Sequence, residues 1–469
     1  MIRLSPYIES IIESIIFPSS FCVTRITPKN TWDTARLFSH FESQISKRSV
    51  AIRSTAAILI AFFLLPAAGF AQAEPSSAGG APTAGAALPP DVLELRREGM
   101  EAMYNFDYAA AHAKYEEIRK RLPQHPAGDL YLATLIWLQH LSKSRRLQTG
   151  LYNNKSNFYA GAENAKEDSE GDVVDASVDR AFRDRMAQAK TKALALVAKN
   201  KGDADALYFL GSYYGVMAGY EASSARKFTA AMRNGSRCVD AHQKVLKLKP
   251  DYYDAYLSVG MYDYIVGNLP FGYKALGAIA GIRGNKQRGI TRLQTMIEKN
   301  ASNADDARVL LLAVYQNEKR YNDALALLQQ LTAKYPNSYL LKLETATILI
   351  KLDRADEAYK MFESLLKDPA ASAVIDLVHY QYAEALAHNK EYQRAAEHFL
   401  AVPQAAGANA NLTTLALLRA AQFLDLAGQR NEAIAQYKTV LTRPNVYDTR
   451  AQAEKGLKQP FVVKEKKGA

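Results

Sequence analysis

A pattern of small and bulky side chains recurs four times in the last third of the chain and restricts the folds that the chain can adopt. In three copies, two alanines lie twelve residues apart and a large side chain follows the second after four residues. The first copy has a leucine in the first position. Two antiparallel helices approach closely only where small side chains meet, and a bulky residue one turn later fills the groove beside them. The positions are Leu312, Ala324 and Leu328; Ala346, Ala358 and Phe362; Ala383, Ala395 and Phe399; and Ala421, Ala433 and Tyr437.

The copies recur every 34 to 38 residues, close to the ~34-residue period of the tetratricopeptide repeat (TPR). The chain resembles that family from about Asn303 to Pro444, and the helix from Ala204 to Val216 resembles it as well. The resemblance implies an all-α, right-handed α–α superhelix, that is, a TPR solenoid. An earlier unit has the same features at Gly99, Asp107, Tyr108, Ala111, Tyr115 and Pro123.

Between these units the pattern diverges. The polar stretch from Ser142 to Asp172 predicts a long surface loop. The helices predicted over Val173–Lys199 and Ala222–Leu248 are longer than those of a standard repeat. The segment Tyr253–Leu293 contains a distinctive set of small and aromatic residues: Gly260, Tyr262, Tyr264, Gly267, Pro270, Gly281, Gly284, Gly289 and Leu293. With these residues it resembles the divergent TPR family of eukaryotic inclusion-body-clearance proteins, which is also linked to lipid handling, and the resemblance implies a divergent repeat there.

The N-terminal region predicts export. Lys47, Arg48 and Arg53 precede an apolar run, Thr55–Leu65, which is followed by an A-x-A sequence at 71–73. These features are typical of a secretory signal. We therefore expect export across the inner membrane to a periplasmic or cell-envelope location, with an uncleaved membrane anchor as the alternative. The expected division is 1–49 start-site extension, 50–73 signal peptide, 74–90 flexible linker, 91–300 divergent TPR-like array, 301–458 regular repeats and 459–469 basic tail.

The sequence shows no convincing catalytic, cofactor-binding or metal-binding set. H-E-x-x-H, G-x-S-x-G and C-x-x-C are all missing from it. The net charge of +11 is spread along the chain, which does not favour a nucleic-acid partner. The turn Gly281–Lys286 lacks the G-K-[ST] of a P-loop and is interpreted as a tight helix–helix turn. We therefore predict a non-enzyme, and keep as an alternative an enzyme with its site between Ser142 and Gly289.

The leading functional hypothesis is a scaffold that binds a protein or peptide in the groove of the solenoid, because the first helix of each repeat lines that groove. The alternative is a lipid or membrane-surface role, based on the apolar Leu269–Ile282 beside Arg283, Lys286 and Arg288. The predicted groove residues are Tyr208, Ser212, Leu257, Met261, Tyr264, Val309, Ala313, Gln316, Asn317, Leu343, Thr347, Lys351, Tyr380, Glu384 and His388.

Overall fold

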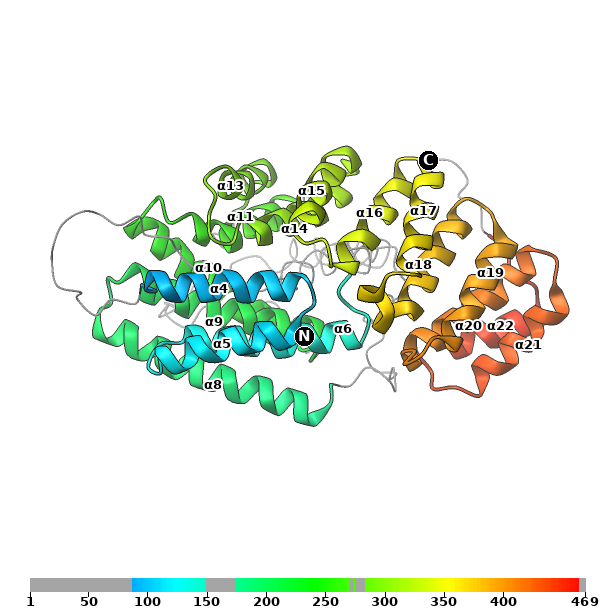
Figure 1. Ribbon diagram of the computed structural model, residues 1–469, viewed down its shortest axis with the longest axis horizontal. Helices are drawn as coiled ribbons and strands as arrows, with labels where there is room; N and C mark the ends of the chain where they lie inside the picture. Colours follow the sequence, from blue (N-terminus) through cyan, green and yellow to red (C-terminus); the bar gives the residue numbers. More distant parts are fainter. Residues whose placement is uncertain (1–86, 149–173, 270–273, 275–282, 464–469) are drawn as a thin grey trace, which may run out of the picture. The chain divides into compact units, whose positions relative to one another are not determined.

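The described part of the chain is helical throughout. A computed structural model describes residues 87–148, 174–269, 274 and 283–463, and these residues form α-helices and short 3-10 helices but no strand (Figure 1). The all-α prediction is therefore confirmed. None of the described helices is long and apolar enough to cross a bilayer. The predicted start-site extension and signal peptide, and most of the predicted linker, lie outside the described residues.

The helices divide into two compact units. The described residues of unit 1 lie within Leu196–Ala307, with gaps at 270–273 and 275–282, and unit 2 joins the N-terminal helices up to Ala195 with the chain from Arg308 onward. Unit 1 contains α9 (Ala204–Ser223), α10 (Phe228–Leu248), η2 (Tyr253–Ala255), α11 (Tyr256–Gly267) and α13 (Lys286–Glu298). The division falls within α8 (Ala176–Lys199) and α14 (Ala304–Asn317).

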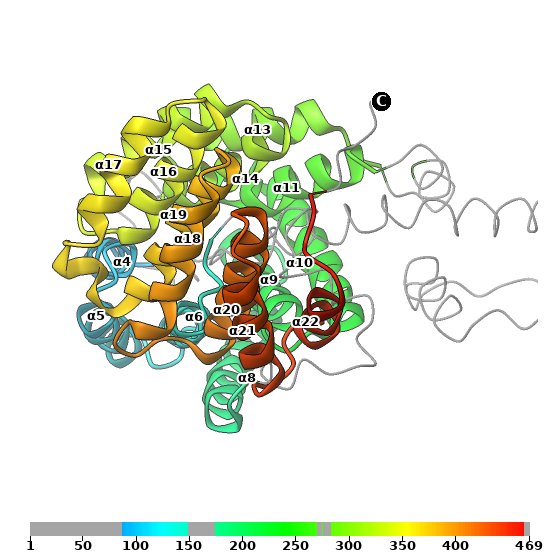
Figure 2. The ribbon, with the colours of Figure 1, turned by 90° about the vertical axis from the view of Figure 1, so that its right-hand side faces the viewer.

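Unit 2 is a series of helix pairs that include the regular repeats. Pairs such as α18–α19 and α20–α21 follow one another (Figure 2). The remaining elements of unit 2 are α4 (Pro90–Tyr104), α5 (Tyr108–Arg121), α6 (Ala127–Lys143), α15 (Tyr321–Lys334), α16 (Tyr339–Lys351), α17 (Ala355–Leu365), η3 (Pro369–Val374), α18 (Ile375–His388), α19 (Tyr392–Ala401), η4 (Val402–Gln404), α20 (Ala410–Leu426), α21 (Arg430–Leu441) and α22 (Thr449–Lys458).

The repeated alanines and large side chains explain how these pairs stack. Alanines at the helix crossings, such as Ala383 and Ala395, are fully buried. The large residue then contacts a ring on the next first helix. Phe362 stacks on Tyr382 with ring centroids 5.0 Å apart, and Phe399 stacks on Phe423 at 5.6 Å. The bulky position therefore joins one repeat to the next.

Unit 1 uses glycine where the regular repeats use alanine. A Cβ added to Gly211 would lie 2.4 Å from the ring of His242, so α9 and α10 approach closely there. Gly260 and Gly289 meet in the same way where α11 crosses α13. As predicted, α10 is long: it has 21 residues, whereas α17 in a regular repeat has 11. It begins at Phe228, however, and not at Ala222, which belongs to α9.

Candidate functional site

The predicted groove residues of unit 1 lie in its core. Tyr208 stacks on the His242 ring of α10 at 4.8 Å, and the Ser212 hydroxyl donates to the Tyr208 carbonyl at 3.0 Å. Because Gly211 brings the two helices together, this side of α9 faces α10. We therefore correct the expectation that these side chains are exposed on a groove. The buried residues are Tyr208, Ser212, Leu257, Met261 and Tyr264.

A buried cluster around His242 brings a histidine, a cysteine and a serine side chain together. The Nδ1 of His242 lies 2.6 Å from the Ser258 hydroxyl and 3.8 Å from the Cys238 sulfur, and its Nε2 lies 3.1 Å from the Tyr208 carbonyl. Burial raises the pKa of the Cys238 thiol to about 12 and lowers the pKa of His242 to about 4. A nucleophilic cysteine needs the reverse, a thiolate beside an imidazolium. The cluster is therefore suited to packing, and it does not support the enzyme alternative.

Acid should destabilise the protein through His242. Its pKa falls from 6.5 to about 4 on folding, so between these values the unfolded chain binds a proton that the folded chain excludes. Stability should therefore fall as the pH drops from 6.5 towards 4, by on the order of 2–3 kcal/mol from this residue. Urea denaturation at a series of pH values measures the slope. His242→Gln should flatten it, whereas the exposed control His112→Gln should leave it unchanged; equal slopes in all three proteins would contradict the prediction.

In unit 2 the predicted groove residues are partly accessible. Leu343 is buried, whereas Asn317, Lys351 and His388 are exposed and stand at the C-terminal ends of α14, α16 and α18. Between these extremes lie the half-buried residues, Val309, Ala313, Gln316, Thr347, Tyr380 and Glu384. The structure thus leaves one end of these first helices open to solvent.

Polar side chains join the first helices of successive repeats. The Gln316 amide donates to the Glu344 carboxylate at 3.2 Å, which links α14 to α16. Arg419 of α20 donates to both carboxylate oxygens of Glu384 on α18 at 2.8 Å. Glu344 and Arg419 were not among the predicted residues, because their partners lie in the neighbouring repeat and no spacing within one repeat identifies them.

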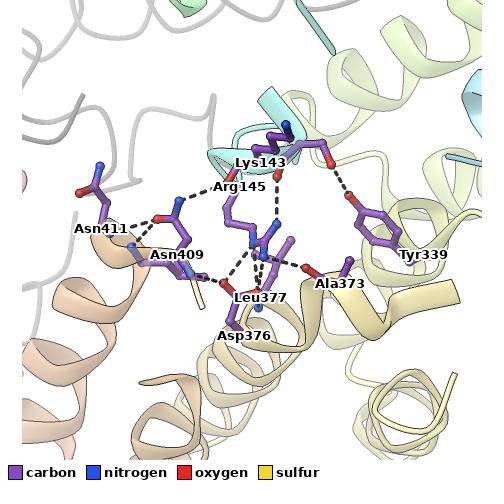
Figure 3. Close-up of polar contacts among 10 residues, drawn as sticks. Lys143, Arg145, Tyr339, Ala373, Asp376, Leu377, Asn409 and Asn411 are labelled. Atoms are coloured by element: carbon purple, nitrogen blue, oxygen red, sulfur yellow. Dashed lines mark hydrogen bonds and ion pairs between the residues drawn. The ribbon is translucent and has the colours of Figure 1, made fainter. Parts of the chain in front are cut away.

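The N-terminal ends of the same first helices hold another part of the chain. Arg145, just after α6, donates from Nε to the two carboxylate oxygens of Asp376 at 3.0 and 3.1 Å (Figure 3). Its Nη2 also donates to the Ala373 carbonyl at 2.8 Å. Arg145 is 7% exposed and Asp376 is 1% exposed, so this ion pair is shielded from water.

The repeats hold the Asp376 carboxylate in place. Asp376 is the second residue of α18, and its carboxylate accepts the backbone N–H groups of Leu377 and Asn409, each at 2.8 Å. Asn409 is the N-cap of α20, and its side-chain amide donates to the Lys143 carbonyl at 3.1 Å. One carboxylate therefore connects α18, α20 and the end of α6.

Further contacts continue along this line. The Ser142 hydroxyl lies 3.1 Å from the Tyr339 hydroxyl at the start of α16, and Arg146 donates to the Tyr447 hydroxyl at 3.2 Å shortly before α22. We call Ser142–Arg146 the α6 end segment. We call the ends of the repeats that it contacts the N-terminal rim, defined by Tyr339, Asp376, Asn409 and Tyr447.

The predicted loop from Ser142 to Asp172 requires a correction at its beginning. Ser142 and Lys143 belong to α6, and Arg145, Arg146 and Gln148 are buried. Residues 149–172 lie outside the described residues. The sequence does not predict this burial, because Asp376, which compensates the Arg145 charge, lies 231 residues further along the chain. Charged residues are buried when a distant partner is placed beside them.

The lipid alternative is based on two groups of residues. Of its basic residues, Arg288 is ion-paired, and most of its apolar segment lies outside the described residues. The Arg288 guanidinium donates to the buried Asp263 carboxylate at 2.8 Å, and Arg292 donates to the same group. Most of Leu269–Ile282 lies outside the described residues. Within the described ranges, no group of three or more His, Cys, Asp or Glu side chains is placed to hold a metal ion.

One protein-family model matches part of the chain. Residues 255–408 match the family model described as Iml2/Tetratricopeptide repeat protein 39, which covers most of the segment Tyr253–Leu293 and the first regular repeats. Residues 255–408 therefore contain divergent tetratricopeptide repeats. The predicted resemblance to TPR proteins is therefore confirmed.

Solved structures similar to this protein share little sequence with it. PilF of Pseudomonas aeruginosa is 16% identical with a TM-score of 0.33, and the match covers 55% of this chain and 99% of that one. Yeast Tom70 is 11% identical with a TM-score of 0.34, covering 78% and 88%. A human IFIT1 dimer with m7Gppp-AAAA is 13% identical with a TM-score of 0.38, covering 86% and 85%. No curated protein matches the chain in sequence.

Proposed function

We propose that this TPR protein is a non-catalytic scaffold that binds a segment of a partner protein across the first helices α16, α18 and α20. The observation that carries the proposal is the N-terminal rim, where these helices already bind a stretch of polypeptide from outside the repeats. The opposite ends of α16 and α18 expose Lys351 and His388. Stacked helix pairs leave a continuous surface of this kind, which suits an extended or helical ligand.

We also propose that this binding takes place outside the cytoplasm, in the periplasm or the cell envelope. The support is the predicted signal at residues 50–73, with its basic start, apolar run and A-x-A sequence. N-terminal sequencing of the protein from fractionated cells tests the proposal. A mature N-terminus close to residue 74 in an envelope fraction is expected, and an uncleaved chain in the cytosolic fraction would refute it.

Site-specific photo-crosslinking should distinguish the two faces of the repeats. A photoreactive phenylalanine analogue at Lys351 or His388 should capture one common partner, because both positions lie on first helices. The exposed positions Lys360 on α17 and Glu397 on α19 serve as matched controls on second helices and should capture little of it. Equal capture from all four positions, or capture from the second helices alone, would argue against the proposed face.

A further inference from the structure

The N-terminal rim has the features of a recognition site for arginine. We propose that the α6 end segment occupies this site as an internal ligand, and that a partner segment bearing an arginine competes with it for Asp376 and Asn409. This inference rests on the proposed scaffold function and names the chemistry of the partner.

The receiving side is complete without Arg145. The Asp376 carboxylate keeps the N–H groups of Leu377 and Asn409 whether or not a guanidinium is bound. Its position at the start of α18 also favours a negative charge, because the helix dipole is positive there. The Ala373 carbonyl adds one more acceptor. A guanidinium from any polypeptide would therefore find these acceptors already in place, in an arrangement that an ammonium group fills less well.

Asn409 adds a contact that reads the backbone of the bound segment. Its side-chain oxygen caps α20 by accepting the N–H groups of Asn411 and Leu412 at 3.1 and 3.0 Å (Figure 3). The capping fixes the orientation of the amide, so its nitrogen points to the Lys143 carbonyl. The rim therefore recognises one guanidinium and one nearby carbonyl, which every arginine-containing segment can supply.

The contacts that hold the α6 end segment are suited to exchange. The contacts described above between it and the rim are ionic or polar, and a buried ion pair stabilises little on balance because desolvation offsets the attraction. The hairpin α4–α5 has aromatic contacts of its own, since Tyr104 stacks on Tyr335 at 4.6 Å and Phe106 contacts the ring of the rim residue Tyr339 at 4.1 Å. The segment can therefore leave the rim while these rings keep the hairpin attached.

Hydrogen exchange on the full chain tests whether the segment is detachable. In Arg145→Gln, amides of residues 139–146 should exchange at least about tenfold faster, while those of α18 and α20 keep their protection. Arg97→Gln is the matched control, because Arg97 pairs with Glu94 and Glu101 on the exposed side of α4 and its loss removes the same charge. If α18 and α20 lose protection equally, or the Arg145 variant fails to fold, the segment is a fixed part of the core and the proposal is wrong.

Peptide binding tests the recognition itself. The probe is a fluorescent peptide of residues 136–148, compared with the same peptide carrying glutamine in place of its arginine at position 145. Binding is measured by fluorescence anisotropy. The full-length Arg145→Gln protein should bind the arginine peptide at least about tenfold more tightly than the wild-type protein binds it. The same Arg145→Gln protein should bind the arginine peptide at least about tenfold more tightly than it binds the glutamine peptide. Equal binding of both peptides, or binding of neither, would overturn the proposal.

The two proposals can fail separately. Crosslinking from Lys351 and His388 without selective binding of the arginine peptide would leave the scaffold and remove the arginine site. Selective peptide binding without crosslinking from those positions would leave the arginine site and remove the proposed scaffold. If both hold, Arg145→Gln should also increase capture of the partner, because the internal ligand no longer competes.

Discussion

Replacing Asp376 with alanine should lower the free energy of unfolding of unit 2 by about 3–5 kcal/mol, the usual loss when one member of a buried ion pair is removed. The Arg145 guanidinium would remain shielded from water without a counter-ion. The N–H groups of Leu377 and Asn409 would also lose their acceptor. Urea denaturation of the full chain, followed by far-UV circular dichroism, measures the loss.

The reciprocal change should have a smaller effect. In Arg145→Gln the carboxylate keeps two backbone donors, so we expect a loss of about 1.5–3 kcal/mol, the worth of hydrogen bonds to a charged group. Even if the α6 end segment leaves the rim in the Asp376 variant, the two N–H groups stay without their acceptor. The loss of unfolding free energy in Asp376→Ala should therefore still exceed the loss in Arg145→Gln. A larger loss for Arg145→Gln than for Asp376→Ala would contradict this account of the carboxylate.

Gly289→Ala should destabilise unit 1 by at least about 3 kcal/mol, at the upper end of the range for overpacked sites. The added Cβ would lie 2.4 Å from the Gly260 carbonyl oxygen and 2.6 Å from the Tyr264 backbone nitrogen. Both atoms belong to the backbone of α11, so no side-chain rotation relieves the overlap. The two helices would have to separate, which would disturb the packing of buried Leu293 at the same crossing. Thermal and urea denaturation of the full chain measure the change.

Gly202→Ala is the matched control. A Cβ at Gly202 would approach nothing nearer than the Asn200 side-chain oxygen at 3.5 Å, which is an ordinary van der Waals contact. The substitution should change stability by no more than about 0.5 kcal/mol, as is usual for exposed positions. Comparable losses in both variants would show that the close crossing at Gly289 is not the cause.

Much of the fold was predictable from local patterns. Ala383, Ala395 and Phe399 recur at spacings that a helix pair requires, because small residues set how closely two helices approach. Such constraints act within one repeat, so they are visible in a short stretch of sequence. Around Gly260 and Gly289 it was the resemblance to the divergent TPR family that indicated a divergent repeat, and the family model begins to match there.

The candidate site depended on contacts that no repeat contains by itself. Tyr208 and Met261 have the periodicity expected of groove residues, yet they are buried, since helical spacing does not say which neighbour covers a face. The sequence predicts Arg145 in a polar surface loop, whereas the fold places Asp376 beside it. The chain by itself determined that helices form and pair, because those interactions are local. Only the tertiary structure decided which charges are buried together, because burial depends on segments that are far apart in the chain and meet only on folding.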